Sequence, residues 1–206
     1  MDPENRKTED EGGQELSPET VREIENSAFD LDDKVSILLV KAGLKPTALL
    51  YLETLGGKEE VSEEQIIACK KLLQNLGPFS EGRHFDEDHK LKSGGTAKTE
   101  AVEFLVGNTP ENLQRLKLAV ENNNAYETGL ALGYCKTAVD AYCGTGELLD
   151  ESTLWGEEWA REAMTFKPCK LSAEHFKEEL EYYQKWADYV KRTSPVLYKK
   201  MMGISK

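Results

Sequence analysis

The stretch AYETGLALGYCKTAVDAYCGTG, residues 125–146, decides how the middle of this chain folds. Apolar residues stand at helical spacing on both sides of Gly133. Glycine readily takes the left-handed conformation that ends many helices, and the next residue is then often apolar. The stretch therefore predicts two short helices that meet at Gly133, with Tyr134 filling the corner and the Thr137 hydroxyl capping the second helix.

A similar pattern occurs upstream, where AGLKPTALLYL at 42–52 aligns without gaps with LGYCKTAVDAY at 132–142. Gly43 then matches Gly133, an apolar residue follows in both, and Thr-Ala comes four positions after each glycine. The match predicts a second helix–Gly–helix corner near residue 43, with a helix over 46–55. It also raises the hypothesis of an internal duplication.

Periodicity and capping residues predict the remaining elements. Helices are expected over 17–28, 32–42, 63–76, 110–122, 155–164 and 172–192, and from 195 onward. Residues 77–95 are predicted to form a long irregular loop. Alternating residues over 99–106 predict a strand, and because a single strand cannot satisfy its own backbone, we expect it to pair with a second short strand at 164–168.

These elements predict a mainly α protein with one short two-stranded β element. One globular domain is expected over residues 17–206. Residues 1–16 lack hydrophobic periodicity and are predicted to be a disordered acidic arm.

The net charge of −12 is concentrated at the start of the chain, because residues 1–33 carry 12 acidic and 3 basic side chains. The rest of the chain is nearly neutral and has no dense stripe of Lys and Arg, so a nucleic-acid partner is not expected. No stretch approaches the roughly 20 apolar residues that a membrane span needs. The acidic, polar start is unlike a secretory signal, and a cytoplasmic location is therefore expected.

The pair of helices predicted at 125–142 also resembles a helix-turn-helix, with a small residue at Gly129 and Gly133 in the turn. The outward positions of the second helix would carry Lys136, Asp140 and an alanine, with no Arg, Asn or Gln to meet base edges. These side chains favour a structural corner. A helix-turn-helix nucleic-acid-binding protein is the alternative. Lys136 and Asp140 are also candidate contacts for a protein partner.

The segments LGYCKTAVDAY and FKPC together resemble an uncharacterised family of archaea and candidate-phylum bacteria. In that family G-Y-P-x-x-A/C-V is followed by a P-C segment and a long terminal helix. The resemblance covers about residues 100–200 and implies no known activity. The family has Pro where this chain has Cys135, and Cys where it has Thr137, Ala138 and Ser172.

The stretch GRHFDEDHK, residues 82–90, is the richest in metal-ligating side chains. It predicts either a solvated polar loop or a site for a divalent metal, with Arg83 as an additional contact for an anion or a partner. The candidate metal ligands are His84, Asp86, Asp88 and His89. A second, weaker alternative is a metal site made of Cys135, Cys143, Cys169 and His175.

The long helix predicted near the C-terminus carries aromatic residues on one stripe and further apolar residues on another. Burial of both stripes is the favoured interpretation, and a partner or self-association surface is the alternative. The aromatic stripe consists of Tyr182, Trp186 and Tyr189.

No catalytic constellation is evident in the sequence. The leading hypothesis is therefore a binding or protein-interaction domain. The alternative is a metal-dependent enzyme or ligand-binding protein that uses the 82–90 stretch.

Overall fold

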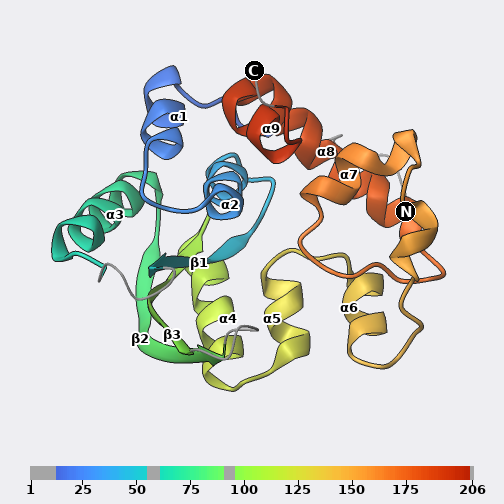
Figure 1. Ribbon diagram of the computed structural model, residues 1–206, viewed down its shortest axis with the longest axis horizontal. Coiled ribbons are helices and arrows are strands. Elements are labelled where there is room, and N and C mark those ends of the chain that lie inside the picture. The colour runs from blue at the N-terminus through green and yellow to red at the C-terminus, as the bar shows by residue number, and fades with distance from the viewer. Residues whose placement is uncertain (1–12, 55–60, 91–95, 205–206) are drawn as a thin grey trace, which may run out of the picture.

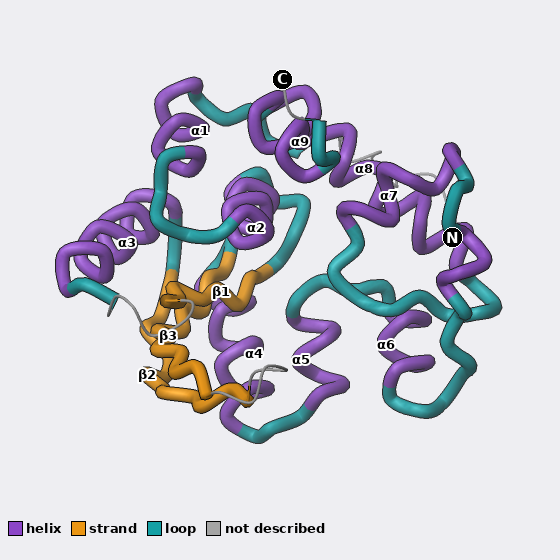
Figure 2. The backbone as a smooth tube through the Cα atoms, in the orientation of Figure 1, coloured by secondary structure: helices purple, strands orange, loops and turns teal. Residues whose placement is uncertain are grey.

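The computed structural model describes residues 13–54, 61–90 and 96–204, and at 54, 81, 85–90 and 96–100 it describes the backbone alone. A three-stranded antiparallel sheet lies on one side, and helices surround it and form the rest of the molecule (Figures 1 and 2). The strands are β1 (Thr47–Thr54), β2 (Phe79–Lys90) and β3 (Thr96–Gly107), in the order β1-β3-β2. The predicted mainly α class is confirmed, whereas the β element has three strands instead of two.

The helices of the first half are α1 (Pro18–Glu25), α2 (Leu31–Lys41), α3 (Glu63–Leu76) and α4 (Pro110–Glu121). Those of the second half are α5 (Ala125–Ala131), α6 (Lys136–Tyr142), α7 (Arg161–Phe166), α8 (Phe176–Thr193) and α9 (Pro195–Met201), with short 3-10 turns η1 (Glu151–Leu154) and η2 (Glu158–Ala160) before α7. Within the described ranges, none of these helices combines the length and apolar character that crossing a bilayer requires.

Both faces of the sheet are covered by helices. Val102, Phe104 and Val106 of β3 lie in the main hydrophobic core together with residues of α2, α3 and α8. Leu105 points to the opposite face and packs with Leu116 of α4 and with the end of α5. Alternate residues of β3 therefore contribute to two different cores, as expected for a strand between two helical layers.

The helix predicted over 46–55 is strand β1, so this prediction is wrong. Ala48, Leu50 and Leu52 are buried in the main core, while Leu49 packs on the second core. A strand that is covered on both faces gives an almost continuous apolar run, which periodicity alone cannot distinguish from a buried helix.

The two glycine corners nevertheless begin alike. Gly43 and Gly133 have φ angles of +77° and +79°. In each corner the glycine N–H donates to a carbonyl three residues back, and the N–H of the next residue, Leu44 or Tyr134, donates to one five residues back. This is the Schellman arrangement of helix ends. The next elements differ, because a strand comes after Gly43 and helix α6 comes after Gly133, so only the corner at 133 joins two helices.

The two corners contact each other in the folded chain. The Thr47 hydroxyl donates a hydrogen bond of 2.7 Å to the carbonyl oxygen of Ala131. A Cβ placed on Gly133 would lie 2.5 Å from Cδ of Pro46. The similar stretches at 42–52 and 132–142 therefore form one packed junction, through which the sheet meets the α5–α6 pair.

Two further predictions are corrected. Residues 79–90, predicted as loop, form β2, because pairing with β3 satisfies a backbone whose polar sequence does not favour a strand. Residues 164–168, predicted as the second strand, form the last turn of α7 and the two residues after it, and β3 pairs instead with β1 and β2. The predicted capping box of α3, Ser62 with Gln65, is present.

The ends of the domain also differ in detail from expectation. Residues 1–12 of the predicted acidic arm lie outside the described residues. Gln14 contacts the domain, since its N–H donates to the Ala42 carbonyl and its own carbonyl accepts from the Tyr189 hydroxyl. The long helix begins at Phe176 instead of at residue 172.

Candidate functional site

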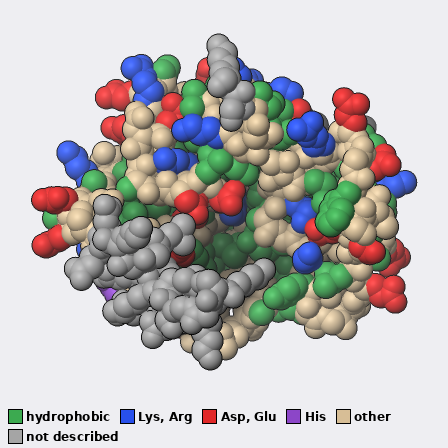
Figure 3. Space-filling view, viewed as in Figure 1, with side chains coloured by type: hydrophobic (Ala, Val, Ile, Leu, Met, Phe, Trp, Pro, Cys, Tyr) green, Lys and Arg blue, Asp and Glu red, His purple; other side chains and the backbone are tan. Residues whose placement is uncertain are grey.

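A cleft of about 880 Å³ lies between the sheet, helices α5 and α6, and the loop 167–170. Figure 3 shows a recess at the centre of this face with apolar side chains inside it. The apolar lining comes mainly from Leu49, Leu132, Val139 and the rings of tyrosines. The charged side chains of the lining are Arg83, Glu103, Glu121, Lys167 and Lys170.

Glu103 of β3 is the acidic group that the sheet contributes to the cleft. It lies directly opposite Tyr51 of β1. On its other side the register of β2 shifts between residues 81 and 84, so Gly82 and Arg83 together stand opposite the single residue Glu103. This is a β-bulge, a distortion that redirects side chains and is common next to functional sites.

The bulge makes room for the carboxylate. A Cβ on residue 82 would collide with the carboxylate of Glu103 and would lie 2.9 Å from Cδ1 of Leu105. A side chain at position 82 would therefore displace the Glu103 carboxylate and the end of the Leu105 side chain, and glycine leaves both in place. The bulge, the glycine and the acid form one local arrangement.

The Glu103 carboxylate is buried but only loosely held. Its side chain is 2% exposed, and Nη2 of Arg83, a side chain that is 74% exposed, lies 3.6 Å from Oε2. The Tyr51 hydroxyl is 3.5 Å from the same oxygen. Good charge-assisted hydrogen bonds measure about 2.7–2.9 Å. Both of these contacts are therefore longer than a strong hydrogen bond, and one comes from a flexible exposed side chain.

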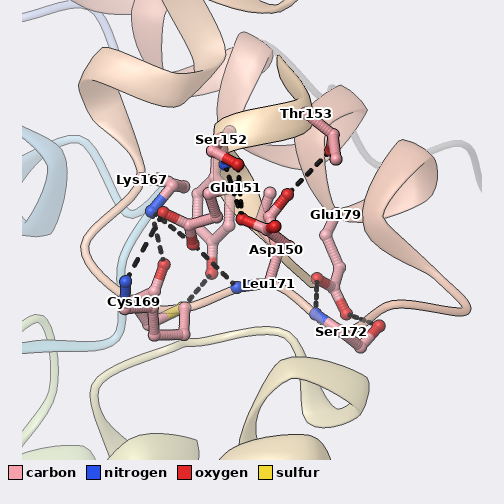
Figure 4. Close-up of polar contacts among 11 residues, drawn as sticks. Asp150, Glu151, Ser152, Thr153, Lys167, Cys169, Leu171, Ser172 and Glu179 are labelled. Carbon is pink, nitrogen blue, oxygen red and sulfur yellow. Dashed lines mark hydrogen bonds and ion pairs between the residues drawn. The ribbon is translucent and has the colours of Figure 1, made fainter. Parts of the chain in front are cut away.

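The opposite wall of the cleft is the loop 167–170, and it is held rigidly. Nζ of Lys167 lies 3.0 Å from Oε1 of Glu151 and donates a 3.0 Å hydrogen bond to the Cys169 carbonyl (Figure 4). Glu151 also accepts from the N–H of Leu171 at 3.3 Å. The Lys167 ammonium group therefore makes its contacts within the protein, whereas Lys170, 3.8 Å from Glu151, is largely exposed.

Tyr51 and Tyr134 of the cleft remain neutral at physiological pH. Burial raises the pKa of Tyr51 to about 12, and the nearby Glu103 carboxylate contributes to this rise. Burial likewise raises the pKa of Tyr134 to about 12. Together with Tyr142 at the end of α6, these rings give the cleft three aromatic walls. Electron-rich ring faces attract cations.

Behind Tyr134 lies a buried lysine. Nζ of Lys45 is 6.0 Å from the centre of the Tyr134 ring and 5.7 Å from that of Trp186. It donates a 3.2 Å hydrogen bond to the Ser36 hydroxyl. Burial lowers the pKa of Lys45 to about 8, and the charge of Asp33 partly opposes this shift. Lys45 is nearly inaccessible, so it supports the cleft wall without reaching a ligand.

Two of the four cysteines lie close to Tyr183, and one of them, Cys169, lines the cleft. Sγ of Cys169 is 3.1 Å from the Tyr183 hydroxyl, which also accepts a 3.5 Å hydrogen bond from the N–H of Cys135. Burial raises the pKa of the Cys169 thiol and raises that of Cys135 to about 11. Both are therefore protonated at neutral pH, unlike a nucleophilic or metal-binding thiolate.

The structure describes the side chain of only one of the four predicted metal ligands. His84 is an exposed residue of β2, and the side chains of Asp86, Asp88 and His89 lie outside the described ones. Among described side chains, no three His, Cys, Asp or Glu residues are placed to hold one metal ion. This includes the cysteine–His175 set. The metal site at 82–90 therefore stays a prediction, although its backbone is strand and not loop.

The predicted partner contacts on α6 bind each other. Nζ of Lys136 lies 2.6 Å from Oδ2 of Asp140. The Tyr126 hydroxyl donates a 3.1 Å hydrogen bond to Oδ1 of the same aspartate. The Thr137 hydroxyl, expected to cap α6, instead donates to the buried carboxylate of Glu179. Lys136 and Asp140 thus stabilise the α5–α6 pair, and this face offers little net charge.

The aromatic stripe of α8 is a core feature. Trp186 and Tyr189 are buried, and Tyr182 is partly buried with its hydroxyl 3.3 Å from the carbonyl of Gly133. The stripe therefore lacks the exposure that a partner or self-association surface would require, and this alternative prediction is wrong. The stripe packs against α2 and against the corner at Gly133 instead.

Comparisons of the chain with protein-family models, curated proteins and solved structures gave no match. The site must therefore be interpreted from its own chemistry. The sequence prediction missed Glu103, although a signal was present, because Glu103 interrupts the apolar run from Ala101 to Val106. A charged residue is rarely buried without a reason.

Proposed function

We propose that the protein binds a small organic cation, such as an alkylamine or a guanidinium compound, in the cleft, and that Glu103 is its anionic anchor. The observation that carries the proposal is the buried, loosely held carboxylate in a hollow with aromatic walls. Ligand sites are typically apolar clefts with a small number of placed polar groups. We also propose a cytoplasmic location, which the four unpaired cysteines support.

A cation satisfies this cleft better than an anion or a neutral ligand. Burying a carboxylate is costly unless an opposite charge compensates for it. The contacts from Arg83 and Tyr51 are too long to supply that compensation in full. The tyrosine rings on the walls add a further preference for cations.

Arg83 has a defined part in this proposal. Its exposed guanidinium compensates the charge of Glu103 only in part while the cleft is empty, and the ligand's cationic group replaces it. The ligand therefore competes with an internal cation. Removing the charge of Arg83 should increase affinity for the ligand, whereas removing the charge of Glu103 should decrease it.

The test measures binding of spermidine, agmatine, choline and phenethylamine by thermal shift and calorimetry, with neutral alcohols and carboxylates as matched non-cationic probes. A ligand at 100 times its Kd stabilises a protein by about 2.7 kcal/mol, equivalent to a rise in Tm of about 5–10 °C for a domain of this size. We expect at least one amine to raise Tm while the non-cationic probes do not.

Glu103→Gln should lower amine affinity by about 30-fold or more, since disrupting a desolvated charge pair costs about 2–5 kcal/mol. Arg83→Gln should raise it. Glu121→Gln is the matched control, because it removes one negative charge from an exposed side chain at the rim of the same cleft. If Glu103→Gln and Glu121→Gln bind amines equally well, the proposal is refuted.

A further inference from the structure

The segment that joins α6 to α7 presents two tryptophans to solvent. Trp155 is 79% exposed and Trp159 is 56% exposed. Tryptophan is usually well buried because its ring is large and apolar. We call Trp155, Glu157, Glu158 and Trp159 the tryptophan surface. None of these residues lines the cleft that holds Glu103.

The exposure does not come from a loosely attached loop. Leu154 and Ala160, which flank the tryptophan surface, are buried in the main core. The segment consists of two 3-10 turns, η1 and η2. Nε1 of Trp159 donates a 3.1 Å hydrogen bond to Glu157, which fixes the indole and leaves its ring face open. The backbone is therefore held in a shape that points both rings outward.

Shallow grooves flank the two rings. One groove of about 640 Å³ runs beside Trp155 toward Arg161 and Met164. Another of about 470 Å³ lies between Trp159 and Leu180 of α8. An extended segment of a partner could therefore cross the surface and contact both tryptophans.

The charge of the segment limits which classes of molecule can bind to it. Residues 146–160 contain five acidic side chains and no basic one. Glu151 is neutralised by Lys167 and Lys170. Glu158 is exposed and has no ionic partner among the described residues. Figure 3 shows acidic and hydrophobic side chains on the right-hand edge of this face, with some basic side chains among them. The five acidic side chains disfavour nucleic acids and anionic membranes as partners, although Arg161 and Lys177 line the grooves as well.

We propose that the tryptophan surface is a docking site for an arginine-containing, basic segment of a partner protein. Guanidinium groups stack on indole faces and also pair with carboxylates, so a single residue type satisfies both features of the surface. Tryptophan and arginine are among the residues most enriched where protein interfaces gain their energy. Glu157 and Glu158 provide the ionic contacts.

The experiment titrates the full chain with a fluorescent peptide of alternating Arg and Gly, and with Lys-Gly and Glu-Gly peptides of equal length. We expect the Arg peptide to bind most tightly, the Lys peptide less tightly and the Glu peptide not at all. Affinity should fall as salt is raised, because exposed charges are screened. Tryptophan emission should change on binding, since Trp155 and Trp159 are exposed and Trp186 is buried.

Replacing both Trp155 and Trp159 by Ala should weaken Arg-peptide binding by about five- to thirty-fold, the sum of two exposed cation–π contacts. Glu158→Gln should weaken it less. Ile67→Ala is the matched control, because it removes an exposed apolar side chain of α3 and should leave the affinity unchanged.

Three outcomes would overturn the proposal. One is equal binding of the Arg peptide to the wild type and to the double tryptophan variant. Another is loss of peptide binding in Glu103→Gln with retention in the double variant, which would place the peptide in the cleft and leave the proposed amine site intact. The last is a wild-type dimer in sedimentation that the double variant dissociates, which would make a second copy of the chain the occupant.

Discussion

Substituting Gly133 by Ala tests the packing of the two glycine corners on each other. Gly43 and Gly133 have nearly the same backbone conformation, with φ of +77° and +79°. Their surroundings differ. A Cβ on Gly133 would lie 2.5 Å from Cδ and 3.1 Å from Cγ of Pro46, whereas a Cβ on Gly43 would meet nothing within 4 Å. Gly43→Ala is therefore a matched control that isolates the clash.

The expected magnitudes combine two separate costs. Placing Ala in the left-handed conformation costs about 1 kcal/mol at either position. Overpacking against Pro46 adds about 1–3 kcal/mol for Gly133→Ala alone. The Pro46 ring is rigid and adjoins the strand that forms the sheet edge, so it cannot move aside as a flexible side chain would. Gly133→Ala should therefore lower the free energy of unfolding by about 2–4 kcal/mol, and Gly43→Ala by about 1 kcal/mol.

Urea unfolding followed by circular dichroism measures both values, and the slope m should stay the same in the wild type and both variants. In thermal unfolding Tm should fall by about 2–4 °C for Gly43→Ala and by at least about twice that for Gly133→Ala. Equal destabilisation by the two substitutions would show that the corner at Gly133 does not rest on Pro46, and it would refute the junction between the sheet and the α5–α6 pair.

Three other predictions concern Thr47, Asp33 and the predicted metal site at residues 82–90. Thr47→Val should destabilise the fold by about 1–2 kcal/mol in urea unfolding. The reason is that the buried Thr47 hydroxyl donates a hydrogen bond to the Ala131 carbonyl, which would lose this donor. An unchanged urea midpoint would argue against this hydrogen bond. Burial raises the pKa of Asp33 to about 7, so the folded chain keeps a proton that the unfolded chain releases above about pH 4. Stability should therefore fall as pH rises from about 4 to 7, and Asp33→Asn should flatten this fall; parallel pH profiles for the two proteins would contradict the assignment. If residues 82–90 hold a divalent metal, elemental analysis of the purified protein should show less metal in His84→Ala and in Asp86→Ala, and unchanged metal content in both would eliminate that site.

The sequence was informative about helix ends. The Ser17 and Ser62 caps, the proline starts at 18, 110 and 195, and the break near Asn123 all correspond to observed helix boundaries. These signals are local, because a cap satisfies N–H groups only a few residues away. Local signals therefore located most helices correctly, including the pair around Gly133.

The sheet could not be predicted in the same way. β2 has the polar sequence FSEGRHFDEDHK, and its strand conformation depends on hydrogen bonds to β3. β1 has an apolar run that helix and strand accommodate equally well until both of its faces are known to be covered. The candidate site depends on the same pairing, because the bulge at Gly82 and Arg83 exists only when β2 lies against β3.

The sequence alone therefore determined where helices begin and end, and it indicated the left-handed turns at Gly43 and Gly133, since these depend on neighbours along the chain. Tertiary structure decided that a strand follows one glycine and a helix the other, that the two corners pack on each other, and that Glu103 faces a cleft beside Tyr51 and Arg83. The physical reason is that strand pairing and the burial of a charge depend on groups distant in sequence, whose positions no local pattern specifies.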